Sequence, residues 1–267
     1  MSTADFSCLL YERQGHVAVV TLNRPERMNA FGGTLKQEIV LAMQRADKDP
    51  EVRVIVLTGG GAAFCAGGDV KEMAETRASG EGRSLREKTR PARDDALLAI
   101  LEATKPVIAA VNGAAAGAGM NLALAADIRL ASTRARFSQA FVNRGLSPDT
   151  GATYFLPRIV GLSKACELVF TGDTVDAAEA LRLGIVSRVL EPEVLMPEAM
   201  ALAARIAQGP PVAIQLAKQA LHRGAEGSIR DALARETAAF NVCSDTEDAR
   251  EGAESFLQRR PAVFKGR

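Results

Sequence analysis

Two segments of the sequence share one order, in which an apolar run is followed by a glycine-rich turn and a second apolar run. They read VIVLTGGGAAFCAGGDV from Val54 and VIAAVNGAAAGAGMNL from Val107, 53 residues further on. A helix that begins just after a glycine turn presents free N–H groups. Two such turns could direct two N–H donors at one developing negative charge, as an oxyanion hole requires. From the pattern alone, tight turns that only pack helix against sheet are the commoner interpretation.

A single carboxylate stands in the segment GLSPDTG, as Asp149. One well-placed carboxylate can take a proton from one carbon and return it to another. Ser-Pro-Asp-Thr-Gly is also typical of a helix start, in which Asp149 or Thr150 would cap a helix through Tyr154. From the residues alone, we prefer the capping role.

Other catalytic arrangements are missing from the sequence. No GxGxxG follows a strand, and neither GxxxxGK[ST] nor GxSxG occurs. The four cysteines form no CxxC pair, and with only His16 and His222 they make no zinc set. The Rossmann, P-loop and hydrolase-triad classes are therefore excluded, and we predict no metal.

The composition is that of a folded, soluble protein. Among 267 residues 47% are hydrophobic and 24% charged, with a net charge of +1, no Trp and 4% aromatics. No global field or stacking platform would attract nucleic acid, and none would attract an anionic membrane. The uncharged stretch 106–126 has nine alanines and is broken by Gly113, so it is a poor membrane span. MSTADFSCLLYERQG has no secretory pattern, and we expect a cytoplasmic protein.

The elements that would position these residues alternate between strand and helix, which predicts an α/β fold. The predicted strands are 16–22, 52–58 and 106–111, and the predicted helices among them are 34–46 and 119–126. From Pro197 onward only helices are predicted, at 197–208, 211–223, 228–241 and 246–259. We therefore divide the chain into a core, 1–196, and a C-terminal helical module, 197–267.

Five segments carry a resemblance to a known family. They are LNRPERMNAF (22–31), AFCAGGDVKEM (63–73), VNGAAAGAGMNLALAADIRLA (111–131), GLSPDTGATYFLPRIVG (145–161) and REGAESFLQRRPAVFKGR (250–267). Together they closely resemble the crotonase superfamily, the enoyl-CoA hydratase/isomerase family, over essentially the whole chain. The resemblance implies a spiral of ββα units with a C-terminal all-helical trimerisation module, assembled as a homotrimer or a dimer of trimers.

The resemblance also implies an acyl-thioester site. The N–H groups of Gly68 and Ala118 would hold the thioester oxygen as it becomes an enolate. Hydratases of the family use two glutamates to activate water, and this chain has Asn121 and Phe141 at those positions. Asp149 resembles the base of the 3-enoyl to 2-enoyl-CoA isomerases, especially the ring-epoxide isomerases of phenylacetyl-CoA catabolism, and this resemblance reverses our preference for capping.

For the coenzyme A part of the substrate, the resemblance suggests Arg24 and Arg27 near the phosphates, although exposed turn charges are an equal alternative. The residues lining the adenine and pantetheine path would be Ala30, Ala66, Asp69 and Val70. Lys265 would meet the coenzyme A of a neighbouring subunit. Residues 71–95 would be a solvated helix pair or a mobile lid.

The predicted function is therefore an acyl-CoA isomerase with Asp149 as its proton shuttle and no permanently bound cofactor. One alternative is an enoyl-CoA hydratase of the same family, in which Asp149 handles water. The other is a non-catalytic coenzyme A-binding or assembly subunit.

Overall fold

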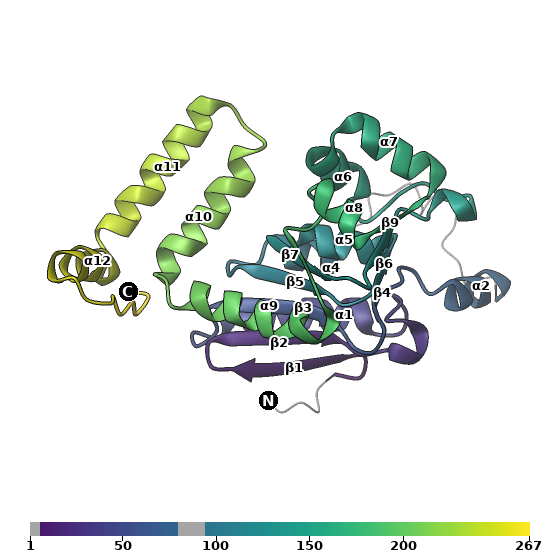
Figure 1. Cartoon of the computed structure of the whole chain (residues 1–267), viewed down its shortest axis with the longest axis horizontal. Helices are drawn as coiled ribbons and strands as arrows, with labels where there is room; N and C mark the ends of the chain where they lie inside the picture. Colours follow the sequence, from purple (N-terminus) through teal and green to yellow (C-terminus); the bar gives the residue numbers. More distant parts are fainter. Residues whose placement is uncertain (1–5, 80–93) are drawn as a thin grey trace.

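A twisted, mostly parallel sheet forms the centre of the molecule (Figure 1). The computed structural model describes residues 6–79 and 94–267. Within these residues the sheet has six strands in the order β1-β2-β3-β5-β7-β10, and only β1 is antiparallel to its neighbour. Their bounds are Leu9–Gln14, Val17–Leu22, Val54–Gly59, Val107–Val111, Ile128–Ser132 and Arg188–Leu190. The three predicted strands are thus β2, β3 and β5.

The central strands β3 and β5 are covered on both faces, as their continuous Val, Ile and Ala runs require. Side chains of one face pack with α1 (Leu35–Lys48), α4 (Asp95–Leu101) and α5 (Ala118–Ala125). Those of the other face, including Val54 and Ile108, pack against α9 (Pro192–Ala207). The sheet therefore separates two apolar layers.

A second, smaller sheet carries the two glycine-rich turns. Its strands lie in the order β4-β6-β8-β9 within the described residues, with bounds Ala63–Cys65, Ala114–Ala116, Arg136–Ser138 and Thr174–Asp176. Helix α2 (Val70–Ala78) follows the turn after β4, and α5 follows the turn after β6. Helices α6 (Ala152–Val160), α7 (Leu162–Thr171) and α8 (Ala177–Arg182) complete this side of the core.

Small residues let α5 lie directly against β4. Every residue of α5 is buried, and a Cβ added at Gly119 would lie 2.0 Å from the Cys65 carbonyl oxygen. The alanine-rich stretch 106–126 contains the predicted strand and buried helix, and between them the short strand β6, where only a turn was predicted. No helix in the part of the chain that the structure describes is both long enough and apolar enough to cross a membrane.

An arm of three helices extends from the core: α10 (Pro211–Gly224), α11 (Ile229–Ser244) and α12 (Glu247–Gln258) (Figure 1). Helix α9, predicted to begin at Pro197, begins at Pro192, because proline fits the first turn of a helix. The predicted division at 196 therefore falls inside a helix that packs on the sheet, and the projecting arm begins at α10.

Polar contacts from Asp127 and from Arg53 attach the arm to the core. Lys218 Nζ of α10 also donates to the Lys105 carbonyl oxygen at 3.0 Å. Asp127, at the start of β7, lies 2.8 Å from Lys218 Nζ and 2.6 Å from His222 Nε2, both on α10. Arg53, just before β3, donates to the carbonyl oxygens of Ala207 (2.9 Å) and Phe264 (3.0 Å). The Arg53 contact fixes the C-terminal tail, which folds back from α12 toward the core.

Residues 80–93 of the predicted lid segment 71–95 lie outside the described residues. The described residues of this segment are 71–79, in the exposed helix α2 and its C-cap, and Asp94 and Asp95 at the start of α4.

Candidate active site

The two glycine-rich turns lie side by side because β4 and β6 are neighbouring parallel strands. Ala63 pairs with Ala114, and Cys65 with Ala115. A Cβ added at Gly67 would lie 2.6 Å from the Ala116 carbonyl oxygen and 3.6 Å from the Ala118 nitrogen. Turns that are 50 residues apart in sequence therefore lie side by side, which the internal repeat offered only as the less common interpretation.

Neither the Gly68 N–H nor the Ala118 N–H donates a hydrogen bond within the strands and helices around it. Ala118 is the first residue of α5, whose first intrahelical bond runs from Asn121 N–H to the Gly117 carbonyl. Gly68 forms an isolated bridge with Phe31, made by the Gly67 carbonyl and the Asp69 N–H. The two N–H groups that the resemblance implies as donors thus lie on adjoining turns, and that of Ala118 lies at the positive end of the α5 dipole.

Phe141 packs against the second turn. A Cβ added at Gly117, which has φ +52°, would lie 3.3 Å from Phe141 Cζ. The left-handed backbone at Gly117 and the absence of a side chain there let the ring approach the turn. At this position the chain offers an aromatic wall and no carboxylate.

Asn121 is fully buried and hydrogen-bonded on both sides. Its Oδ1 accepts from Gln139 Nε2 at 2.8 Å, and its Nδ2 donates to the Asp149 carbonyl oxygen at 3.0 Å. Within the described residues, Gln139 Oε1 is buried without a hydrogen-bond partner. The amide of Asn121 is not ionisable near neutral pH, so it cannot act as a base. Its hydrogen bond to the Asp149 carbonyl holds the 149 segment in place.

Asp149 is exposed and does not cap α6. The N-cap of α6 is Gly151, without a side-chain hydrogen bond, and the Asp149 carboxylate accepts from Thr150 Oγ1 at 2.8 Å. The capping role preferred from the residues alone is therefore wrong. Thr150 (φ +50°) and Gly151 (φ +76°) are left-handed, so the chain turns away before the helix begins at Ala152.

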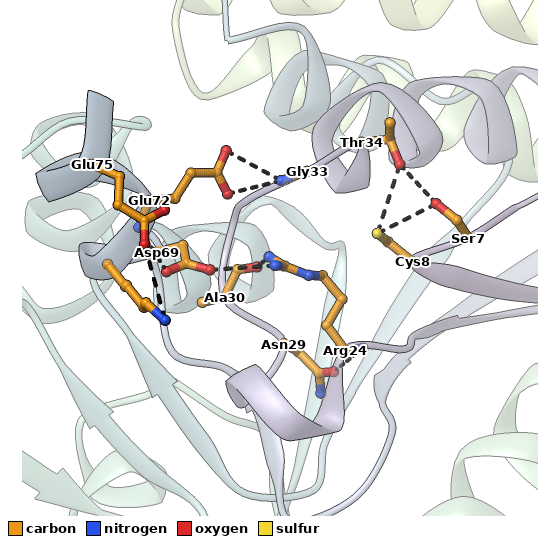
Figure 2. A network of polar contacts seen from close by, with 11 residues as sticks. Ser7, Cys8, Arg24, Asn29, Ala30, Gly33, Thr34, Asp69, Glu72 and Glu75 are labelled. Carbon is orange, nitrogen blue, oxygen red and sulfur yellow. Dashed lines mark hydrogen bonds and ion pairs between the residues drawn. The ribbon is translucent and has the colours of Figure 1, made fainter. Parts of the chain in front are cut away.

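Arg24 and Asp69 contact each other. Arg24 Nη2 lies 3.3 Å from Asp69 Oδ2, and Arg24 Nη1 donates to the Ala30 carbonyl at 2.7 Å (Figure 2). Burial raises the pKa of Asp69, but the Glu72 N–H and the guanidinium groups of Arg27 and Arg24 outweigh it, so the pKa is lowered. Asp69 also caps α2 through the Glu72 N–H.

The other residues predicted to bind coenzyme A lie in different surroundings. Arg27 and Val70 are exposed, Ala66 is half-buried and Ala30 is buried. Lys265 is exposed on the C-terminal tail, where its N–H donates to Asp248. The arm lies on the opposite side of the molecule from α2 (Figure 1), so the structure does not bring Lys265 to the turns of its own chain.

Sequence reasoning missed two buried amides, Gln139 and Asn29. Asn29 is fully buried and donates to the carbonyl oxygens of Gly60 (2.9 Å) and Ala63 (2.8 Å). The only signal was an amide in a short segment that has aromatic or aliphatic residues nearby, RMNAF and FSQAF. Both positions connect loops that are distant in sequence.

A spiral of strand–turn–helix units with an extended helical arm, and with paired backbone donors at adjoining turns, defines the crotonase class. The comparisons with known proteins agree with that class. A model described as enoyl-CoA hydratase/isomerase matches residues 12–267.

The chain is 42% identical to the short-chain-enoyl-CoA hydratase of Clostridium acetobutylicum, over 98% of this chain and 100% of that one. It is 39% identical to the 2,3-dehydroadipyl-CoA hydratase of Escherichia coli, over 97% and 99%. The crystal structure of an enoyl-CoA hydratase from Bacillus anthracis superimposes with a TM-score of 0.90 at 31% identity, over 98% and 100%. The chain belongs to the enoyl-CoA hydratase/isomerase family.

Proposed function

We propose that this protein binds an acyl-CoA thioester and moves its double bond from the 3,4 to the 2,3 position. The Asp149 carboxylate takes a proton from the α-carbon, and the electrons of that C–H bond move onto the thioester oxygen. The N–H groups of Gly68 and Ala118 hold this enolate oxygen. The Asp149 carboxyl then returns the proton to the γ-carbon, which re-forms the thioester carbonyl. A ring-epoxide acyl-CoA could be isomerised with the same groups.

The observation that carries this proposal is the hydrogen-bonded pair of Asn121 and Gln139. At the two positions where the resemblance places the glutamates of hydratases, the chain has the buried amide of Asn121 and the ring of Phe141. Neither group can accept a proton from water. The carboxylate of Asp149 belongs to the segment whose backbone Asn121 holds, which favours a single-base reaction.

Hydration of a 2-enoyl-CoA is the second candidate, and the names of the relatives favour it over isomerisation. They include the two hydratases already described and a crotonyl-CoA hydratase of Syntrophomonas wolfei at 38% identity. In this alternative Asp149 would activate the water that adds to the β-carbon. A third candidate is a coenzyme A-binding or assembly subunit without turnover.

The test compares 3-hexenoyl-CoA and crotonyl-CoA in D2O, with wild type and Asp149→Asn. We expect double-bond migration with deuterium incorporation, reduced at least about 100-fold in the variant. Asp173→Asn, an exposed carboxylate beyond α7, is the matched control and should leave migration unchanged.

Crotonyl-CoA hydration that survives in Asp149→Asn would reject this proposal in favour of a hydratase with another base. Thioester binding without turnover of either substrate, and without an effect of Asp149→Asn, would identify a non-catalytic subunit.

A further inference from the structure

The turn that carries Gly68 is hydrogen-bonded to a loop that lies earlier in the sequence, at residues 28–31. Phe31 N–H donates to the Gly67 carbonyl at 2.6 Å, and Asp69 N–H donates to the Phe31 carbonyl at 2.9 Å. One step further, Ala66 N–H donates to the Met28 carbonyl at 3.0 Å. Gly68 itself lies between these bonds, so the direction of its N–H depends on where segment 28–31 lies.

Arg24 connects the two sides of this bridge. Its Nη1 donates to the carbonyl of Ala30 in segment 28–31, and its Nη2 pairs with the carboxylate of Asp69 in the turn that carries Gly68 (Figure 2). The two side chains are 15% and 7% exposed, so the pair is largely shielded from water. A planar fork that engages two groups fixes their separation, which a single point charge does not.

The loop that presents Arg24 is itself fixed by a buried side chain. Asn29 Oδ1 accepts from the Arg24 N–H at 2.8 Å, while its Nδ2 binds the carbonyls of Gly60 and Ala63. Met28 (φ +51°) and Asn29 (φ +56°) are both left-handed without being glycine, so surrounding contacts must hold them. A second tie runs from Glu72 on α2 to the Gly33 N–H at 3.0 Å (Figure 2).

We propose that Arg24, through Asp69 and Ala30, is a positioning residue that sets the direction of the Gly68 N–H toward the thioester oxygen. This inference rests on the proposed function of the two turns as an oxyanion hole. The second donor, at Ala118, begins a helix packed against β4 and needs no such support. The Gly68 donor lies in an irregular turn, so its alignment depends on this contact.

The competing role for Arg24 is direct binding of a phosphate of coenzyme A. The two roles separate cleanly in kinetics. Loss of a phosphate ligand weakens substrate and transition state alike and raises KM, whereas a misaligned oxyanion donor lowers kcat. The contacts favour positioning, because both terminal nitrogens of the Arg24 guanidinium already donate to acceptors of this chain.

The experiment reads the oxyanion hole without turnover. Acetyl-CoA labelled with 13C at its carbonyl is bound to wild type, Arg24→Lys and Arg24→Gln, and the C=O stretch is followed by infrared difference spectroscopy. We expect the stretch to shift to lower frequency in wild type and to return toward its value in water in both variants. The affinity for unacylated coenzyme A should stay within about threefold.

Steady-state kinetics on 3-hexenoyl-CoA complete the test. A misplacement on the order of 1 Å lowers kcat about 100-fold, and we expect this for Arg24→Gln with KM within about threefold. The double variant Arg24→Gln/Asp69→Asn, which leaves no unpaired buried charge, should lose no more than Arg24→Gln alone. Glu75→Gln breaks only the exposed pair with Lys71 and should behave as wild type.

The outcomes separate this inference from the function on which it rests. No carbonyl shift in wild type would reject the oxyanion hole itself. A shift and a kcat retained in both Arg24 variants would reject only the positioning role. A tenfold rise in KM with kcat unchanged would assign Arg24 to phosphate binding. If Arg24→Gln does not fold, Arg24→Lys and the double variant decide.

Discussion

At the scale of single residues, the hydrogen bonds around Asn121 fix which atom of each amide faces which neighbour. The Asp149 carbonyl can only accept, so it must face the Nδ2 of Asn121. The Oδ1 of Asn121 then accepts from Gln139 Nε2, which leaves Gln139 Oε1 as the unpaired atom. An amide is needed at position 121 because it must both donate and accept.

Asn121→Asp tests this assignment. The carboxylate would face the Asp149 carbonyl as a second acceptor, and we expect a loss of about 1–3 kcal/mol in the free energy of unfolding at pH 7. Burial and the facing carbonyl raise the pKa of the introduced carboxyl in the folded state, so the loss grows as pH rises above the ordinary pKa of about 4.

The measurement is urea unfolding of wild type and Asn121→Asp at pH 7 and pH 4. Their difference should shrink at pH 4, where the protonated carboxyl can donate. An equal difference at both pH values would contradict the assigned hydrogen bonds.

Gly119 is required by close approach. A Cβ there would overlap the Cys65 carbonyl oxygen, while Gly224, at the end of α10, has no heavy atom within 4 Å of an added Cβ. We expect Gly119→Ala to cost about 3 kcal/mol, and Gly224→Ala to change stability by at most about 1 kcal/mol because alanine favours helix. Thermal and urea unfolding of both variants would measure this difference in stability. Equal stabilities would contradict the close packing of α5 on β4.

The sequence predicted the backbone part of the site better than its side chains. The internal repeat offered two adjoining glycine turns as one interpretation, and the family resemblance was needed to prefer it. The environment of Asp149 depended on two left-handed residues, Thr150 and Gly151. Threonine rarely adopts that conformation, so the sequence favoured an ordinary cap.

At the scale of elements, the contact between α10 and the core depends on one carboxylate. Burial raises the pKa of Asp127, but His222, Lys218 and the Val107 N–H together lower it below its ordinary value. A carboxyl with a lowered pKa adds stability above its ordinary pKa and loses it as pH falls through the folded-state value. Docking of the arm should therefore weaken in acid.

We expect Asp127→Asn to cost about 3 kcal/mol, because it leaves the buried Lys218 ammonium without its partner. The loss should appear as faster amide exchange along α10, measured at pH 7. Glu167→Gln, which breaks the surface pair with Lys164, should change exchange little. Unchanged exchange in Asp127→Asn would show that docking of the arm does not depend on this ion pair.

The C-terminal tail offers a second acid-sensitive contact. Arg260 and the Val263 N–H lower the pKa of Glu251 to about 2. The contact is therefore complete above about pH 4.5, the ordinary value, and is lost as pH falls toward 2. Carbon-13 titration of the Glu251 carboxyl should find a midpoint near 2. At pH 7, Glu251→Gln should expose the Val263 amide to faster exchange, while Glu236→Gln on α11 should not.

Strands and helices with clear patterns were predicted to within a few residues, and α9 was not. Pro197 suggested a start, yet the helix begins at Pro192. Proline is favoured only in the first turn of a helix, so Pro197 is an unfavourable interior residue of α9, which is stabilised by burial of Leu195 and Ala199 against the sheet. Such a tertiary contact is invisible in local sequence.

At the scale of the whole molecule, the arm exposes more apolar surface than a lone chain needs. Large side chains on its helices are more than half exposed: Leu221, Ile229, Leu233, Phe240, Phe256 and Leu257. Apolar surface of this extent indicates association. We expect a trimer or a dimer of trimers in solution, as the resemblance implies.

Light scattering after size exclusion would measure this mass. Replacing both Phe256 and Leu257 by Glu should lower it to that of a single chain if α12 lies in the contact. Leu162→Glu, on the exposed start of α7, is the comparison outside the arm. A monomeric wild type would contradict the expectation.

The two adjoining turns have a consequence for how such a protein can change over time. Every amino acid except proline supplies a peptide N–H, so most codon changes at positions 68 and 118 leave both donors present. The side chains that determine the reaction are at positions 121, 141 and 149, and a single mutation can replace each of them. Under the proposed function, the stabilisation of the enolate and the choice of reaction are inherited separately. Under this proposal, new reactions can arise on this chain by single substitutions that leave both backbone donors in place.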